Sequence, residues 1–541
     1  MTPCILKKLI DSGGKMDKFK NIISKMKILP DSAGLSIAIL AGLLGEALFL
    51  LFVLALDVLP FKYVLAILVA LFVVDIIVIL LLNTKKRASI QHLLGLIIIV
   101  LMMNVLLFGD FYVYSTYDTL QRISKYRATW QIYDVISLKD GSYNTIDDVK
   151  GETLNVVQMD SKQLTEAKER LVTGYNVSYN EETNMIDVGR HLISDDGEKH
   201  DNIIMVAREN YDMINKQIKG FKDNTQVIYR MKVKKRADDS AKRIDVTEES
   251  FNVLISGKDV WGKLKNTKSG LSDVNMVMTV NPKTKEVLLT SIPRDSYITL
   301  HSYGAKDKLT HTGVYGEEET KATIEDFLGI DINYEITVNF SMLVDIINAI
   351  DGIDVYSDYD FTSAIADYSY EKGWNHLKGR PALYFARERK SFMEGDMQRN
   401  KNQQKVLKAT IEKVTSSRVI MTRYAKILNA VADKMYTNLS DKDLKKLAKL
   451  TLKNMDKTWT VNTVNISGGT GMAPCYSMGG QNLSCVFPSQ ETVDKAKEMI
   501  HDTMYPVDNT IKKNHKDEET SESGEPSDND ENATDESAES E

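Results

Sequence analysis

The chain has 541 residues, of which 43% are hydrophobic and 26% are charged, and its formal net charge is −7. This length excludes a single domain, and the hydrophobic share is ordinary for a globular protein that also carries membrane segments. The negative charge comes from one end of the chain, because Asp517–Glu541 holds twelve acidic residues and no basic ones. Without that charge of −12 the rest of the chain carries about +5.

Three apolar stretches follow a lysine-rich leader at residues 1–30. They lie near Leu35–Leu56, Lys62–Leu82 and Gln91–Phe108, and each reaches the roughly 20 residues needed to cross a bilayer. The leader and the connection Lys85–Arg87 carry positive charge, so the positive-inside rule places both in the cytoplasm. We therefore predict three transmembrane helices within residues 31–110 and an extracellular location for the segments that follow.

The extracellular part is predicted to contain two folded units and a tail. In residues 118–235, strand-like segments such as Thr153–Met159 alternate with helix-like segments such as Ser161–Val172, which is typical of a small α+β domain. We interpret these residues as an accessory domain and residues 245–507 as the main domain. Residues 510–541 contain too little apolar surface to offset the entropy of ordering, so we expect them to be disordered.

The main domain begins with a hairpin whose ends are charged. Two β-branched-rich runs are joined by the polar turn Asn281–Lys285. Asp273 begins the first strand, and Arg294 and Asp295 follow the second, so an antiparallel pairing brings them to one rim of the sheet. Asp259, in a loop upstream, offers another carboxylate. Carboxylates beside arginines are typical of a metal–phosphate site, although turn or ion-pair roles remain an alternative for both aspartates.

A second charged segment lies about a hundred residues later. In an extended strand Arg387 and Arg389 point the same way, so their guanidinium groups are predicted to lie side by side. After Gly395, the residues Asp396, Arg399 and Gln403 share one stripe of a helix, with Asp396 as a candidate N-cap. Arginine binds phosphate through a planar, permanently charged fork. A solvated basic surface is the alternative interpretation.

Other candidate groups show weaker patterns. His301 and His311 flank a loop that contains Lys308, but neither begins a metal-binding spacing, so we interpret His311 as a residue that orders the loop. Cys475 and Cys485 surround a Gly-Gly turn, and a hairpin disulfide and two free thiols both remain open.

Five short segments resemble the LytR–CpsA–Psr (LCP) family, in that family's order. They are Ser272–Asn275, Pro293–Tyr297, Asp307–Gly313, Arg387–Arg389 and Gly395–Gln403. The resemblance implies an α/β fold in which an LCP-type mixed sheet is covered by helices. Three transmembrane helices and an accessory domain before that sheet are similar to the subgroup of capsule-assembly proteins. It also implies a multi-pass protein of the cell membrane in a Gram-positive-type envelope.

The resemblance assigns roles to individual residues. It implies that Asp259 and Asp273 hold Mg²⁺, and that Asp396 and Gln403 orient the arginines or the head group. The arginines expected to grip a pyrophosphate are Arg294, Arg387, Arg389 and Arg399. Many members have an arginine two positions before Asp273, whereas this chain has Leu271. One head-group contact is therefore expected to be missing.

The activity implied is transfer of a glycan phosphate from a polyprenyl pyrophosphate carrier to peptidoglycan, in assembly of a capsule or a teichoic-acid-like polymer. Attack by a wall-sugar hydroxyl would expel polyprenyl phosphate, with cations stabilising the developing charge. Asp295, Asp396 or an aspartate not bound to metal are the candidates for removing the hydroxyl proton.

The expected partners are the lipid-linked glycan, peptidoglycan, the membrane and capsule-assembly proteins. Two alternatives remain open for the activity: a polyprenyl pyrophosphate phosphatase, and a non-catalytic regulator that binds lipid-linked glycan. We expect no nucleic-acid partner, because the cytosolic leader lacks a helix-turn-helix pattern.

Overall fold

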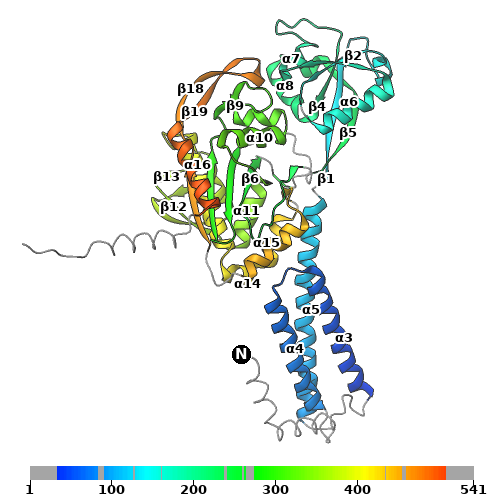
Figure 1. The fold of residues 1–541 in the computed structure, drawn as a ribbon, viewed down its shortest axis with the longest axis vertical. Coiled ribbons are helices and arrows are strands. Elements are labelled where there is room, and N and C mark those ends of the chain that lie inside the picture. The colour runs from blue at the N-terminus through cyan, green and yellow to red at the C-terminus, as the bar shows by residue number, and fades with distance from the viewer. Residues whose placement is uncertain are drawn as a thin grey trace, which may run out of the picture.

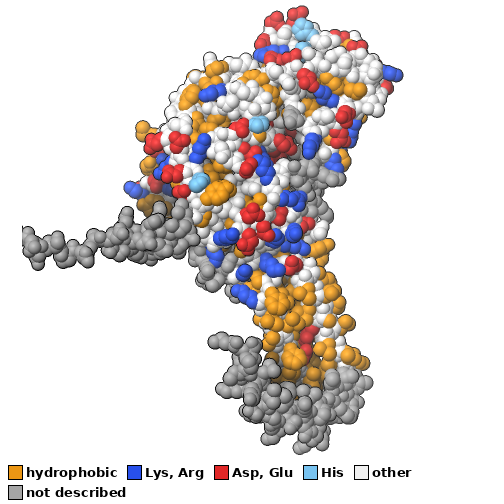
Figure 2. Space-filling model, in the orientation of Figure 1, with side chains coloured by type: hydrophobic (Ala, Val, Ile, Leu, Met, Phe, Trp, Pro, Cys, Tyr) orange, Lys and Arg blue, Asp and Glu red, His pale blue; other side chains and the backbone are white. Residues whose placement is uncertain are grey.

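The structure is a computed structural model that describes residues 33–82, 90–125, 128–159, 161–236, 240–258, 261–262, 273–432, 434–453 and 459–506. Three long helices form a bundle below the globular part (Figure 1): α3 (Ala33–Leu56), α4 (Phe61–Leu82) and α5 (Ile90–Lys125). Each is long and apolar enough to cross a membrane, as predicted. Figure 2 shows hydrophobic side chains covering the bundle and mixed charges on the globular part. The predicted leader and acidic tail lie outside the described residues.

Helix α5 extends well past the predicted end of the third span at Phe108. It continues to Lys125, so residues 118–125 belong to this helix, not to the accessory domain as the sequence indicated. Its last turns contact α14 (Ser417–Val431), where Arg122 Nη2 donates to Asn429 Oδ1 at 3.2 Å. Near the α3–α4 turn, Lys449 of α15 (Asp441–Lys453) lies 2.8 Å from Asp57. The turn between α3 and α4 and the globular part therefore lie on the same side of the bundle.

The accessory domain is built on a five-stranded mixed sheet with strand order β3-β2-β4-β1-β5. Its strands are β1 (Ala128–Leu138), β2 (Thr153–Val157), β3 (Ser178–Glu182), β4 (Ile203–Ala207) and β5 (Thr225–Arg236). Helix α6 (Lys162–Tyr175) begins after Ser161, whose hydroxyl accepts a hydrogen bond from Leu164 N. Its apolar stripe, Leu164, Ala167 and Leu171, is buried on the sheet. Three short helices complete the domain: α7 (Met185–Arg190), α8 (Tyr211–Gln217) and α9 (Phe221–Asn224).

The main domain contains a six-stranded mixed sheet with strand order β16-β11-β6-β7-β8-β17. Its strands are β6 (Phe251–Lys258), β7 (Val274–Asn281), β8 (Glu286–Ile292), β11 (Tyr334–Asn339), β16 (Met435–Thr437) and β17 (Thr460–Asn465). Strands β6 and β7 pair antiparallel, as do β7 and β8, whereas β11 runs parallel to β6 and β17 runs parallel to β8. The ends of β6, β8, β11 and β17 and the start of β7 consequently share one edge.

Helices cover both faces of this sheet, which confirms the predicted α/β layering. Alternate residues of each strand point to opposite faces. On one face Leu254, Val277 and Leu288 pack against α10 (Glu317–Leu328) and α16 (Gln490–Met504). On the other face Met276 and Leu289 pack against α13 (Asp396–Val414) and α15.

Smaller elements surround this core. Four two-stranded sheets pair β9 (Tyr297–Thr299) with β10 (Lys306–Lys308), β12 (Ile353–Ser357) with β15 (Gly373–Leu377), β13 (Phe361–Thr362) with β14 (Ser369–Tyr370), and β18 (Gly468–Cys475) with β19 (Gln481–Pro488). Helices α11 (Phe340–Ala349) and α12 (Gly379–Arg387) add a further hydrophobic cluster around Ile350, Phe385 and Val406.

The accessory domain packs directly on the main domain. Ile214 and Phe221 of the former share one buried apolar cluster with Leu300 and Val314 of the latter. Asn210 Nδ2 also donates to Val314 O at 2.8 Å. Burial of a common core makes the two domains one packed unit.

Candidate active site

Charged side chains gather at the shared edge of the main sheet. Asp273 precedes β7, and its N–H donates to Gly257 O of β6 at 3.0 Å. Arg294 follows β8, and its Nη1 contacts Asp273 Oδ1. The pairing of β7 with β8 brings these two residues together, as the hairpin pattern predicted.

Arg294 lies at the centre of a cluster of carboxylates and cations. Its Nε is 3.6 Å from Asp295 Oδ2 and 3.7 Å from Asp396 Oδ2. Asp396 contacts Arg399 Nη2 at 2.7 Å and Arg389 Nη1 at 3.7 Å. The structure thus joins the two charged segments that are about a hundred residues apart in the chain.

Helix α13 places Asp396 and Arg399 on one stripe, and Gln403 follows one turn later, as predicted. The N-cap prediction for Asp396 is wrong, because Gly395 occupies that position with φ 51° and ψ −113°. A positive φ favours glycine, so the sharp entry into the helix uses Gly395 and leaves Asp396 in the first turn. A carboxylate in a first helical turn is stabilised by the helix dipole.

The predicted extended strand at Arg387–Arg389 is also wrong. Arg387 is the last residue of α12, and its guanidinium lies 4.3 Å above the ring of Phe340, the first residue of α11. Arg389 lies in the loop that follows and is half exposed. The two arginines therefore lie in different surroundings: Arg387 over an aromatic face, and Arg389 beside Asp396.

Glu388, between these arginines, is buried and anchors the loop. Its Oε1 accepts hydrogen bonds from the backbone N–H groups of Arg389, Lys390 and Ser391 at 3.0, 2.8 and 3.2 Å. Its Oε2 accepts from Ser363 Oγ at 2.9 Å and from Ala364 N at 2.6 Å. Burial opposes ionisation, but these donors hold the pKa of Glu388 below its ordinary value. Sequence reasoning missed this role, because the partners of the side chain are mostly backbone groups.

Lys308 is a second residue of the site whose place the sequence did not reveal. Its Nζ lies 3.2 Å from Asp295 Oδ1, and its side chain is largely buried. The neighbouring His311 Nδ1 lies 2.6 Å from Asp307 Oδ1, and both residues are buried. This contact agrees with the interpretation of His311 as a residue that orders the loop.

Two residues singled out from the sequence, Asp259 and Leu271, lie outside the described residues. The end of the loop that carries Asp259 is described. Gly262 N donates to Ser341 Oγ at 2.8 Å, and Asn339 Nδ2 donates to Gly262 O at 2.7 Å. These two hydrogen bonds hold Gly262 beside the start of α11, where Arg387 covers Phe340.

The electrostatics of the cluster favour an anionic ligand. Burial opposes the charge of Arg294, but Asp273 and Asp295 raise the pKa of this guanidinium above its ordinary value. Burial lowers the pKa of Arg399, while Asp396 opposes that shift. The Nε atoms of Arg294 and Arg399 are buried and have no hydrogen-bond partner within the described part of the chain. Buried donors normally have a partner, so these two groups are arranged for an acceptor such as a phosphate oxygen.

The same cluster offers ligands that suit a hard cation. Among the described contacts of Asp273, the ion pair with Arg294 is made by Oδ1. Carboxylate oxygens are the ligands that Mg²⁺ takes in proteins, usually together with substrate phosphates. The residues at this edge thus fit a divalent ion bound beside a phosphate.

A separate buried group combines Asp307, His311 and Cys475, whose potential ligand atoms lie within 4.8 Å of one another. Asp307 already uses Oδ1 for His311 and Oδ2 for Ser477 N, at 2.7 Å. The Sγ atoms of Cys475 and Cys485 are 3.9 Å apart, and both thiols are free and buried. We interpret this group as a structural network that fixes β10 against the β18–β19 hairpin.

An α/β domain with clustered arginines and aspartates at one sheet edge defines a phosphate-binding class of protein. Residues 211–501 match the sequence model of the LytR_cpsA_psr family, and this match covers more than half of the chain. The chain belongs to this family. The match begins at Tyr211, the first residue of α8 in the accessory domain, and includes the whole main sheet.

Curated relatives of the chain are named as transferases. It is 36% identical over 202 residues to the polyisoprenyl-teichoic acid–peptidoglycan teichoic acid transferase TagU of Enterococcus faecalis, covering 37% of this chain and 65% of the relative. It is 37% identical over 212 residues to TagU of Bacillus anthracis, covering 38% and 68%. The chain thus spans about two thirds of the length of these relatives.

Solved structures of similar proteins include TagV and TagT of B. subtilis. TagV is 27% identical, with coverage of 48% of this chain and 98% of TagV and a TM-score of 0.38. TagT is 26% identical, with coverage of 49% and 94% and a TM-score of 0.38.

Proposed function

We propose that this protein transfers a glycan phosphate from a polyprenyl pyrophosphate carrier to peptidoglycan. The observation that carries the proposal is the pair of buried Nε donors on Arg294 and Arg399, neither of which makes a hydrogen bond within the described residues and both of which lie in one charged cluster. A pyrophosphate bound there would satisfy both donors. The names of the relatives support a glycopolymer as the transferred group and peptidoglycan as the acceptor.

The residues of the cluster act by position and charge. Arg294 and Arg399 would bind the phosphate oxygens. Arg389, from the loop after α12, and Arg387, at the end of α12, would add two further cations. As a wall-sugar hydroxyl attacks the sugar-linked phosphorus, these cations stabilise the negative charge that develops on the equatorial and leaving oxygens. The bond to the departing polyprenyl phosphate then breaks.

Two aspartates are placed to take the proton of the attacking hydroxyl. Asp396 is held by Arg399 at 2.7 Å, and Asp295 is held by Lys308 at 3.2 Å. Both carboxylates are held in position by a cation, as a general base requires. We propose that Asp295 or Asp396 removes the proton of the attacking hydroxyl and that Asp273 binds the cation.

We further propose that Mg²⁺ binds at this edge, held by Asp273 and by Asp259. It would supply Lewis-acid neutralisation of the pyrophosphate charge. Asp273 fits this task, because it stands beside the phosphate-binding arginines and presents a hard oxygen ligand.

We propose that the protein lies in the cell membrane with its N-terminus in the cytoplasm and its folded domains outside. The positive charges of residues 1–30 and Lys85–Arg87 support this orientation. The contact of Asp57 with Lys449 supports it as well, because it puts the first outer turn beside the main domain. The transferred polymer would be a capsular polysaccharide or a teichoic-acid-like chain, and capsule-assembly proteins would be its partners.

The test is incubation of the purified full-length protein with lipid-linked glycan, Mg²⁺ and peptidoglycan, followed by analysis of the covalent product. Wild-type protein is expected to form a glycan–phosphate–peptidoglycan linkage, and Arg294→Ala is expected to lose it. Release of lipid phosphate without any linked product would instead indicate a phosphatase. Binding of the lipid without turnover would indicate a regulator.

A further inference from the structure

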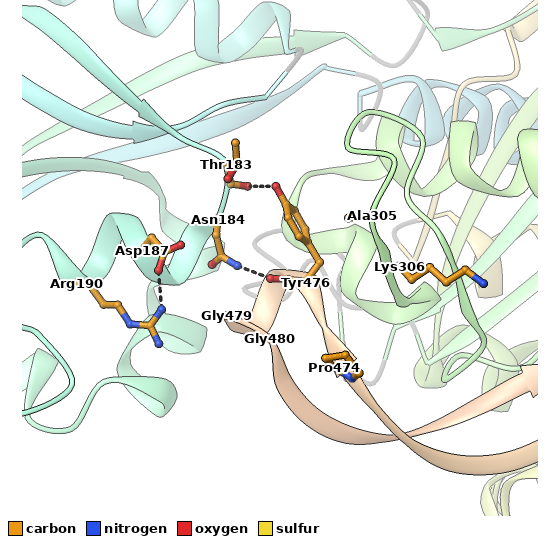
Figure 3. Close-up of a pocket in the computed structure, with 10 residues that line it drawn as sticks. All are labelled: Thr183, Asn184, Asp187, Arg190, Ala305, Lys306, Pro474, Tyr476, Gly479 and Gly480. Carbon is orange, nitrogen blue, oxygen red and sulfur yellow. Dashed lines mark hydrogen bonds and ion pairs between the residues drawn. The ribbon is translucent and has the colours of Figure 1, made fainter.

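A cavity of about 400 Å³ lies between the accessory domain and the main domain (Figure 3). One wall comes from α7 and the residues before it, and the other comes from the start of β10 and the tip of the β18–β19 hairpin. Its volume falls within the range of small-ligand pockets. Neither domain could form this cavity without the other.

The floor of the cavity is fixed by contacts between the two domains. Asn184 Nδ2 donates to Tyr476 O, and Tyr476 Oη donates to Thr183 O at 3.1 Å (Figure 3). The ring of Tyr476 also packs against Tyr303, with 5.5 Å between centroids. A pocket held in this way is formed before a ligand arrives, which reduces the entropy cost of binding.

The cavity carries cationic groups. Arg190 is oriented by Asp195 at 3.0 Å and by Asp187 at 2.5 Å, and the hydrogen bonds that it donates to these carboxylates raise its pKa despite the opposing effect of burial. A Cβ at Gly479 would lie 3.0 Å from Arg190 Nη1, so the glycine leaves the guanidinium accessible. Lys306 also lines the cavity, and its side chain extends away from Arg190 (Figure 3). Asp187, which also lines the cavity, contacts Nη1 of the Arg190 guanidinium, and the charged donors of Arg190 suit an acidic group on the ligand.

Strand β10 connects this cavity to the catalytic cluster. Lys306 and Lys308 lie on the same face of the strand, with buried Asp307 between them on the other face. Lys308 reaches Asp295, whereas Lys306 lines the cavity. Their backbone positions are about 7 Å apart. Tyr297, which pairs with Lys308 across the sheet, has its ring 5.9 Å from Lys306 Nζ. Lys308, Tyr297 and Lys306 thus form a track along β9 and β10, from Asp295 of the charged cluster to the edge of the cavity.

We propose that the cavity is a subsite for the glycan of the lipid-linked donor, and that it binds a sugar unit bearing a phosphate or carboxylate. This inference rests on the proposed transferase function. It assigns the track to the donor because the track begins at the arginine cluster, where the pyrophosphate of the donor would sit. The cavity also lies at the end of the molecule far from the membrane helices, whereas the lipid end of the donor stays in the membrane (Figure 1).

Donors of different length test the proposal with the full-length protein in detergent micelles. One probe is a polyprenyl pyrophosphate that bears a disaccharide, and the other is the same lipid extended by several polyol-phosphate repeats. In Arg190→Gln the KM for the long donor is expected to rise about tenfold, as loss of one charge-assisted hydrogen bond predicts. The KM for the short donor and the kcat for both are expected to stay unchanged. Ala305→Phe, which fills the cavity, should give the same split.

Arg170→Gln is the matched control, because Arg170 forms an ion pair with Glu166 on the surface of α6. Its kinetics should equal those of wild type. An equal rise in KM for both donors, or a rise in KM for peptidoglycan instead, would overturn the donor subsite.

Calorimetry with the soluble polyol-phosphate oligomer gives a readout that does not depend on turnover. Binding that is lost in Arg190→Gln and kept in Arg170→Gln is expected, and binding unaffected by Arg190→Gln would refute the inference. A wild-type protein that binds the oligomer but transfers neither donor would refute the transferase function alone.

Discussion

The substitution Glu388→Gln tests whether a buried carboxylate positions the arginine loop. An amide keeps the shape of the side chain but replaces one acceptor oxygen by an NH₂ group. With the amide oxygen at the Oε1 position, the bonds from Arg389, Lys390 and Ser391 persist as neutral bonds, and Ala364 N–H loses its acceptor. An orphaned buried N–H costs about 1–3 kcal/mol, and hydrogen bonds to a charged acceptor are worth roughly 1 kcal/mol more than neutral ones. The neutral side chain avoids the cost of burying a charge, so we expect a net loss of about 2–4 kcal/mol in unfolding free energy.

Chemical denaturation of Glu388→Gln and wild type over a range of pH is the assay. The folded-state pKa of Glu388 is lowered, so its stabilisation is present above the unfolded value near 4.5 and is lost as the pH falls through the lower folded value. The difference between the two proteins should therefore be largest above pH 4.5 and shrink in more acidic solution. Glu412→Gln is the control, since Glu412 forms an exposed ion pair with Lys408 at 3.8 Å and should change stability by less than about 0.5 kcal/mol.

The transfer rate of the same variant completes the test. Because Glu388 holds the backbone of Arg389, a looser loop should lower kcat about tenfold or more, as small misplacements of positioning groups do. A stability difference that does not depend on pH would show that the charge of Glu388 is not the cause. A destabilised variant with a normal kcat would refute the positioning role.

Three further predictions concern the site and its surroundings. Arg294→Lys keeps the charge but loses the planar fork that contacts Asp273, so kcat should fall by about 10²–10³-fold in the transfer assay; a fall of less than threefold would contradict a central role. Chelation with EDTA should abolish transfer and added Mg²⁺ should restore it, whereas full activity in the chelator would remove the metal from the mechanism. His301 lies 2.6 Å from Asp326, which raises its pKa above 6.5. The stabilisation from this pair is present below pH 6.5 and lost as the pH rises through the higher folded value, so the Tm advantage of wild type over His301→Gln should disappear in alkaline solution. Because both groups are about half exposed, the effect should be small, and an advantage that grows with pH would refute it.

The parts of the site that could be predicted from the sequence depend on regular geometry. The contact of Asp273 with Arg294 follows from hairpin pairing, and the common stripe of Asp396 and Arg399 follows from the helical repeat. Three apolar spans were also predictable, since length and hydropathy alone decide them. The end of the third span was not, because α5 continues through polar residues that hydropathy cannot separate from a loop.

The strand predicted at Arg387–Arg389 failed because a three-residue alternation fits many conformations. Pro381 lies in the first turn of α12, where its missing N–H costs no helical hydrogen bond, and the Ala-Leu-Tyr-Phe-Ala run that follows favours a helix. Glu388 accepts hydrogen bonds mainly from backbone N–H groups, and Lys308 contacts Asp295, which lies thirteen residues earlier in the chain. No local pattern marks such contacts, so only the folded structure shows them.

Helix α5 is longer than a bilayer hydrocarbon core, and its length bears on the distance between the charged cluster and the lipid. Its 36 residues give a rod of about 54 Å, and a bilayer hydrocarbon core takes up about 30 Å. The rest extends beyond the hydrocarbon core, where Arg122 of α5 contacts Asn429 of the main domain. The α3–α4 turn also contacts the main domain, through Asp57 and Lys449. Under the proposed function, a lipid-linked donor would reach the site by lateral diffusion in the membrane. The acceptor would have to lie within the distance from the membrane that the projecting part of α5 spans. Under that function, this geometry would direct attachment to the glycan strands nearest the membrane.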